Sequence, residues 1–80
     1  MVGISNKSLR NALISLISSI NQEIGLSNEN QVLLVIKLNT EDKLFEFNDW
    51  IKNNIQNNKL NATEAEIMRA AVNISKKYDN

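Results

Sequence analysis

The stretch Gln31-Val32-Leu33-Leu34-Val35-Ile36-Lys37-Leu38 decides which folds are open to this chain. Apart from its first residue and Lys37 it is entirely apolar, so it shows neither the one-sided stripe of a surface helix nor the alternation of a half-buried strand. As a helix it would be apolar on every side, and a chain of 80 residues has little mass to cover it. As a strand it has favourable β-branched residues, but no second strand pattern accompanies it.

Two architectures follow, and the sequence leaves both open. In one, residues 28–38 form a short buried helix that begins at Ser27. In the other, residues 31–38 form a strand that pairs with its twin across a homodimer. Either way something outside the segment is needed to cover it, and a second copy of the chain is the simplest candidate. We therefore expect a protein partner or self-association, most simply a homodimer.

Three amphipathic helices are predicted around this segment, over residues 6–24, 40–57 and 63–78. In each of them apolar residues recur every three or four positions, as one face of a helix requires. Ile14 is the one apolar residue of the first helix that falls outside its stripe. The stripe of the middle helix consists of Leu44, Phe47, Ile51 and Ile55. We therefore predict a mainly α single domain over residues 1–80, a small helical bundle that includes segment 31–38.

The ends of the predicted helices carry suitable capping residues. Ser5 or Asn6 is placed to cap the first helix, and Gly25 to end it. Thr63 and Glu66 have the spacing of a capping box at the start of the last helix.

Composition argues against most enzyme chemistry. The chain has no His and no Cys, which removes thiol nucleophiles, Ser/His relays and His- or Cys-ligated metals. Asp42, Glu46 and Asp49 share one helix face and could in principle hold Mg²⁺, but they lie opposite the apolar stripe and are interpreted as a solvated acidic face. We expect no enzyme, no catalytic residue, no cofactor and no metal.

Compartment and source are also suggested by the sequence. The longest apolar run, residues 32–36, is far shorter than the roughly 20 residues that cross a bilayer. No signal-peptide pattern is evident, and we expect a cytoplasmic protein. The content of Asn and Ile is typical of A+T-rich genes, such as those of Gram-positive bacteria, their phages and plasmids.

The function expected from these features is that of a small protein-interaction module that docks an apolar surface onto a partner. Phe45 and Trp50 flank the stripe of the middle helix, and aromatic residues are enriched at binding hot spots. Together with Leu33 and Val35 from the apolar segment, they are the predicted partner-binding residues.

Two family resemblances accompany this expectation. Residues 32–38 before Asn39-Thr40-Glu41, together with residues 66–72, are similar to the ribbon-helix-helix family of DNA-binding dimers. That resemblance implies a strand in the major groove, where only Lys37 among the outward residues could donate to a base. Nine basic and nine acidic residues cancel, which disfavours phosphate binding, so a homodimeric DNA-binding regulator is the alternative function.

The second resemblance concerns the C-terminal part of the chain. Lys59-Leu60 before the Thr63 cap resembles the final loop and helix of bacteriocin immunity proteins, which are small, Cys-poor, cytoplasmic helical bundles. This resemblance implies a role in docking onto a partner protein.

Overall fold

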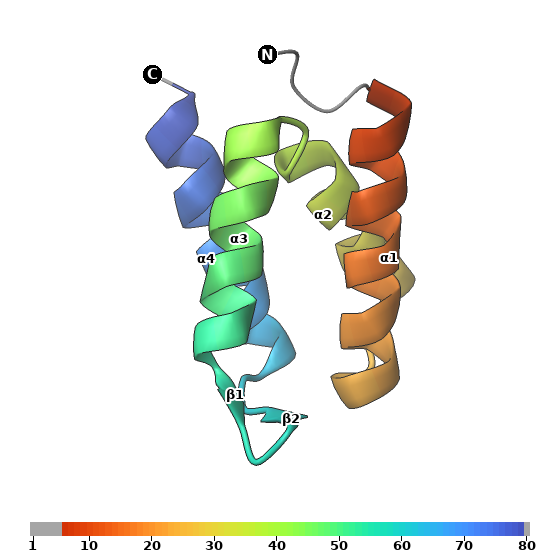
Figure 1. The fold of residues 1–80 in the computed structure, drawn as a ribbon, viewed down its shortest axis with the longest axis vertical. Helices are drawn as coiled ribbons and strands as arrows, with labels where there is room; N and C mark the ends of the chain where they lie inside the picture. Colours follow the sequence, from red (N-terminus) through yellow and green to blue (C-terminus); the bar gives the residue numbers. More distant parts are fainter. Residues whose placement is uncertain (1–5, 80) are drawn as a thin grey trace.

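Helices dominate the structure, a computed structural model that describes residues 6–79 (Figure 1). The elements in chain order are α1 (Asn6–Ile24), α2 (Asn28–Lys37), α3 (Glu41–Asn53), β1 (Ile55–Gln56), β2 (Lys59–Leu60) and α4 (Glu64–Tyr78). The predicted mainly α bundle is therefore confirmed.

The segment that the sequence left undecided is helical. Residues 31–37 belong to α2, and Leu38 caps its C-terminal end by donating its backbone N–H to the carbonyl of Leu34. The strand alternative is not adopted. Leu34 and Leu38 are both 0% exposed, whereas Val32 and Ile36 are each 59% exposed. One side of the apolar part of this helix is thus buried, and the other side faces outward.

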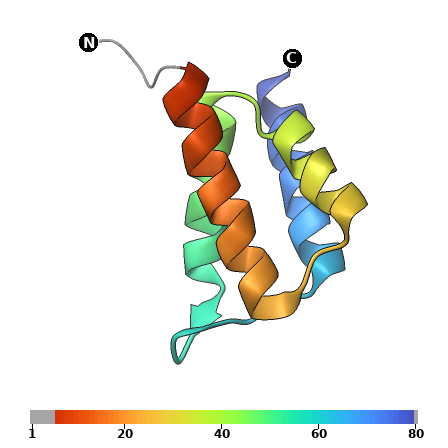
Figure 2. The same ribbon diagram turned by 90° about the vertical axis from the view of Figure 1, so that its right-hand side faces the viewer.

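The four helices enclose one apolar core. α3 packs along α4, and α2 contacts both α1 and α4. Figure 2 shows α1 in front of α3 on one side of the molecule, with α2 and α4 on the other. The core residues are Leu13, Ile17, Ile20, Leu26, Leu34, Leu38, Leu44, Phe47, Ile51, Ile67, Ala71 and Ile74. They include most of the apolar stripes predicted from spacing.

The predicted middle helix over residues 40–57 is too long, because α3 ends at Asn53. A β-hairpin follows, in which Gln56 pairs with Lys59 across a two-residue turn. Asn57 and Asn58 form this turn with φ angles of 53° and 64°. A tight hairpin turn of this kind requires positive φ at both central residues, and Asn tolerates such angles better than most residues.

Ile55 was expected in the core stripe and lies in β1 instead. It is 46% exposed. Its spacing from Ile51 fits a helix, but the chain has already left the helix at Asn54, whose backbone N–H bonds to the carbonyls of Ile51 and Lys52. The hairpin therefore turns this apolar side chain away from the core.

Two of the predicted helix ends are confirmed. Gly25 has φ 74° and ends α1, as expected for a helix C-terminus. Thr63 and Glu66 make the reciprocal hydrogen bonds of a capping box at the start of α4. Of the two candidate N-caps of the first helix, Asn6 is the first residue of α1 itself, and Ser5 lies outside the described residues.

One buried charge was not foreseen. Lys43 is only 4% exposed, although the sequence places it among the polar residues of α3. Its Nζ donates to Asp79 Oδ1 at 2.6 Å and to Asn39 Oδ1 at 3.2 Å. This ion pair joins the start of α3 to the end of α4, and because both partners are satisfied, the buried ammonium is accommodated.

None of the helices within residues 6–79 combines the length and the apolar character needed to traverse a bilayer.

Replacing Leu34 with Ala should lower the free energy of unfolding by about 2–5 kcal/mol, because the change opens a cavity in the core. Ile36→Ala on the exposed side of the same helix is the matched control and should cost about 0.5 kcal/mol. Urea unfolding at low protein concentration measures both. If Leu34→Ala and Ile36→Ala lowered the free energy of unfolding equally, the one-sided burial of α2 would be contradicted.

Replacing Asn58 with Gly should raise the free energy of unfolding by about 0.5 kcal/mol, since Asn-Gly is the preferred pair for this hairpin turn. Asn58→Val should lower it by about 1 kcal/mol, because a β-branched residue resists positive φ. Asn73→Gly, inside α4, is the control and should be destabilising. Thermal unfolding measures all three variants. A lower stability of Asn58→Gly than of the parent chain would refute the turn assignment.

Candidate functional site

The candidate site is the outward side of α2 and the adjoining part of α1. Val32 and Ile36 lie one helical turn apart on α2 and are each 59% exposed, and Ile14 on α1 is 51% exposed. A groove of about 360 Å³ runs between the two helices. Its lining residues are Ile14, Ile17, Ser18, Asn21, Gln31, Val32 and Val35. We call Ile14, Val32, Val35 and Ile36 the α1–α2 face.

The groove is apolar and uncharged. None of its lining residues carries a formal charge. Two of its polar side chains are already occupied, because Asn21 Oδ1 accepts the backbone N–H of Leu26 at 2.7 Å and Gln31 Nε2 donates to the Leu26 carbonyl at 3.0 Å. The groove therefore offers mainly aliphatic surface, which suits apolar side chains rather than a charged ligand.

The connection between α1 and α2 fixes the angle at which this face is presented. Gly25 turns the chain at the end of α1, and the buried Leu26 anchors the link to the core. Ser27 then caps α2, because its Oγ accepts the backbone N–H of Asn30 at 3.2 Å. This bond satisfies a backbone N–H that the start of α2 would otherwise leave unpaired.

A carboxylate from α4 holds the start of α2. Glu64 Oε2 accepts the backbone N–H of Ser27 at 2.8 Å and the Nδ2 group of Asn30 at 2.7 Å. The bond from the Ser27 amide, followed by that from Asn30, lowers the pKa of Glu64 below its ordinary value. Glu64 therefore positions α2 as an ionised group.

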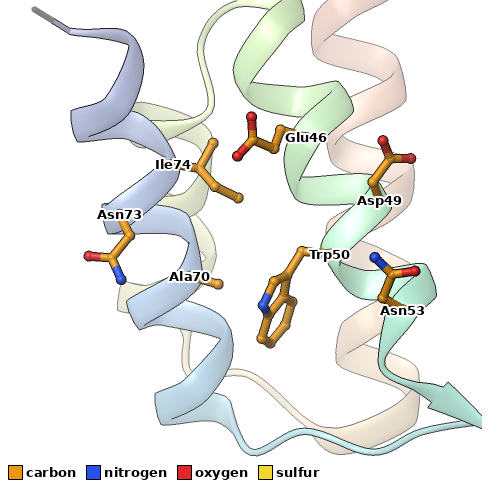
Figure 3. A pocket seen from close by; sticks show the side chains of 7 residues that line it. All are labelled: Glu46, Asp49, Trp50, Asn53, Ala70, Asn73 and Ile74. Carbon is orange, nitrogen blue, oxygen red and sulfur yellow. The ribbon is translucent and has the colours of Figure 1, made fainter.

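A second groove lies between α3 and α4 (Figure 3). It measures about 340 Å³ and is lined by Glu46, Asp49, Trp50, Asn53, Ala70, Asn73 and Ile74. The Trp50 indole projects into the space between the two helices, on the side of Ala70. Its ring is stacked on Phe47, with centroids 6.4 Å apart and planes inclined by 10°. Trp50 is thus half-buried and partly committed to intramolecular packing.

The acidic face of α3 is partly neutralised by α4. Glu46 accepts hydrogen bonds from the Tyr78 hydroxyl at 2.6 Å and from Lys77 Nζ at 2.9 Å. These two bonds, the one from Tyr78 above all, lower the pKa of Glu46. Asp42 and Asp49 remain exposed. No three carboxylates within residues 6–79 gather closely enough to hold a metal ion.

The four predicted partner-binding residues do not share one surface. Val35 lines the groove between α1 and α2, and Leu33 is half-buried on another side of α2. Residues two apart on a helix point about 200° apart, which explains the separation. Phe45 is 50% exposed on α3, whereas Trp50 lies in the groove between α3 and α4.

Three exposed members of the α1–α2 face were missed as site residues. The signal for Ile14 was present, since it falls outside the core stripe of its helix. Val32 and Ile36 could not be separated from Leu34 by periodicity, because the whole segment is apolar. Which of these side chains faces outward depends on where the other helices pack.

Comparisons with known proteins add no relationship: no protein-family model matches the chain, and neither a curated protein nor a solved structure is significantly similar to it.

Acidification should weaken the attachment of α2 to α4. Because the pKa of Glu64 is lowered from 4.5, the stability that its carboxylate contributes is present above that value and is lost as the pH falls through the lower folded-state pKa. Glu64→Gln should therefore show a smaller shift of the urea midpoint between neutral pH and about pH 3 than the parent chain.

The control for this experiment is Asp49→Asn, which removes a carboxylate on the exposed side of α3, away from the contact between α2 and α4. The midpoint shift of Glu64→Gln should depart further from that of the parent than the shift of this control does. An unchanged midpoint shift in Glu64→Gln would contradict the role given to this carboxylate.

Proposed function

We propose that this chain is a small non-enzymatic interaction protein that docks the α1–α2 face onto a partner protein. The observation that carries the proposal is the exposure of Ile14 and Val32 at an uncharged groove, together with the exposure of Ile36 one helical turn from Val32. Covering such side chains removes apolar surface from water, at about 25 cal/mol per Å². A contiguous apolar patch of this kind is typical of a binding surface.

A binding role suits the chemistry of the chain better than catalysis. The sequence holds no His or Cys, and Glu46, one of the two carboxylates that line the α3–α4 groove, already bonds to Lys77 and Tyr78. Trp50 in the same groove packs on Phe47. These contacts support a structural role for the α3–α4 groove and leave the α1–α2 face as the better docking surface.

The biological role that we propose is that of a cytoplasmic regulator, inhibitor or bacteriocin-immunity-like protein of a Gram-positive bacterium, phage or plasmid. The helical bundle and the hairpin that leads into the capped α4 support the last of these. The ribbon-helix-helix alternative has lost its main support, because that resemblance requires a strand over residues 31–38 and α2 occupies them.

Photo-crosslinking in the producing cell tests the proposal. A photoreactive amino acid at position 36 should link the chain to one defined protein, which is then purified and its affinity measured. Ile36→Glu should weaken that binding at least tenfold, since it places an unpaired charge in an apolar contact.

Asn73→Glu adds the same charge on the exposed side of α4, away from the α1–α2 face, and is the matched control. It should leave the affinity unchanged, and circular dichroism should show that both variants keep their helices. A crosslinked partner that binds Ile36→Glu as tightly as the parent chain would refute docking through the α1–α2 face.

A further inference from the structure

We propose that the occupant of the α1–α2 face is α2 of a second copy of this chain, packed antiparallel across a two-fold axis. The inference rests on the proposed function, because it names a partner for the same face. It goes further in committing to the identity of that partner and to its orientation.

The charge pattern of α2 favours this partner. Glu29 lies in the first turn of the helix and Lys37 in the last, and the residues between them carry no charge. In an antiparallel pair the start of each helix lies beside the end of the other, so Glu29 approaches Lys37 of the second copy, and this happens twice. A parallel pair would instead bring like charges and like helix-dipole ends together.

The spacing along the helix allows apolar and charged contacts at once. If Val32 lies opposite Ile36 of the second copy, Glu29 lies opposite position 39 of that copy. This is two residues from Lys37, or about 3 Å along the helix axis. Both side chains are long enough to span such an offset. One register therefore allows the Val32–Ile36 contacts at the centre and the Glu29–Lys37 contacts at both ends.

Neither charged group is committed to a close partner. Between residues 6 and 79, the Glu29 carboxylate and the Lys37 ammonium form neither a hydrogen bond nor a salt bridge. Lys37 is half-buried, and its longer-range attraction contributes to lowering the pKa of Asp79. Glu46 and Glu64, by contrast, accept hydrogen bonds within their own chain. The ends of α2 are thus oppositely charged and free of hydrogen bonds and salt bridges.

Two-fold symmetry adds a requirement that α2 meets. A contact across a two-fold axis uses the same surface on both chains, so that surface must complement itself. The outward side of α2 does so because its centre is aliphatic and its opposite charges are equal in number. Ile14 of α1 extends the apolar contact beside the helix.

Sedimentation equilibrium with charge-swapped variants tests this arrangement. The parent chain should reach twice its mass of 9.1 kDa. Glu29→Lys alone and Lys37→Glu alone should each weaken the dimer about tenfold, because each replaces two attractions with two repulsions. An equimolar mixture of the two variants should recover the dimer, since one chain then carries two positive α2 ends and the other two negative ones.

Asp49→Lys and Lys52→Glu, on the exposed side of α3, make the same charge changes away from the face and should leave the dimer intact. Val32→Glu should abolish it without loss of helix content. The arrangement would be overturned if the Val32→Glu chain still formed the dimer. It would also be overturned if neither the single charge-swapped variants nor their mixture changed the dimer affinity as expected.

The outcomes also separate this inference from the proposed function. If the parent chain stays at 9.1 kDa at every concentration while position 36 crosslinks to a different protein, the inference fails and the proposed function stands. If the chain is monomeric and position 36 crosslinks to nothing, both fail.

Discussion

The structure depends on the one-sided burial of residues 32–36 of α2, which are apolar on every side of the helix. Leu34 and Leu38 reach the centre of the core, and α1 and α4 cover the flanks of α2. A chain of 80 residues has too few other helices to cover α2 on every side. The remaining aliphatic side chains, Val32 and Ile36, therefore face outward. The α2 part of the candidate site thus consists of residues from the same apolar segment that supplies Leu34 and Leu38 to the core.

Polar contacts between distant residues hold this arrangement together in place of a disulfide or a metal. Glu64 on α4 binds the start of α2, and the buried Lys43 on α3 binds Asp79 after the end of α4. Both contacts join elements that lie more than thirty residues apart in the chain. Small domains without covalent staples need such additional ties, and here they fix the helix that carries the exposed face.

Local signals in the sequence predicted the helices well, but they failed at one boundary. Thr63 and Glu66 specify the start of α4 through bonds within a single turn, so no tertiary information is needed. The end of α3 was misplaced because Ile55 continues the helical spacing. Asn57-Asn58 was the missed signal, a weaker turn pair than Asn-Gly, yet able to adopt the positive φ angles that close the hairpin.

The sequence by itself determined that this chain is mainly helical, that it lacks thiol and imidazole chemistry and that segment 31–38 presents a burial problem. These conclusions depend on composition and on contacts within a few residues, which any conformation of the chain must respect. Only the tertiary structure decided that the segment is a helix and which of its apolar side chains remain exposed. Periodicity cannot distinguish the sides of the all-apolar segment 32–36, because only the packing of α1 and α4 against α2 gives it a buried and an exposed side.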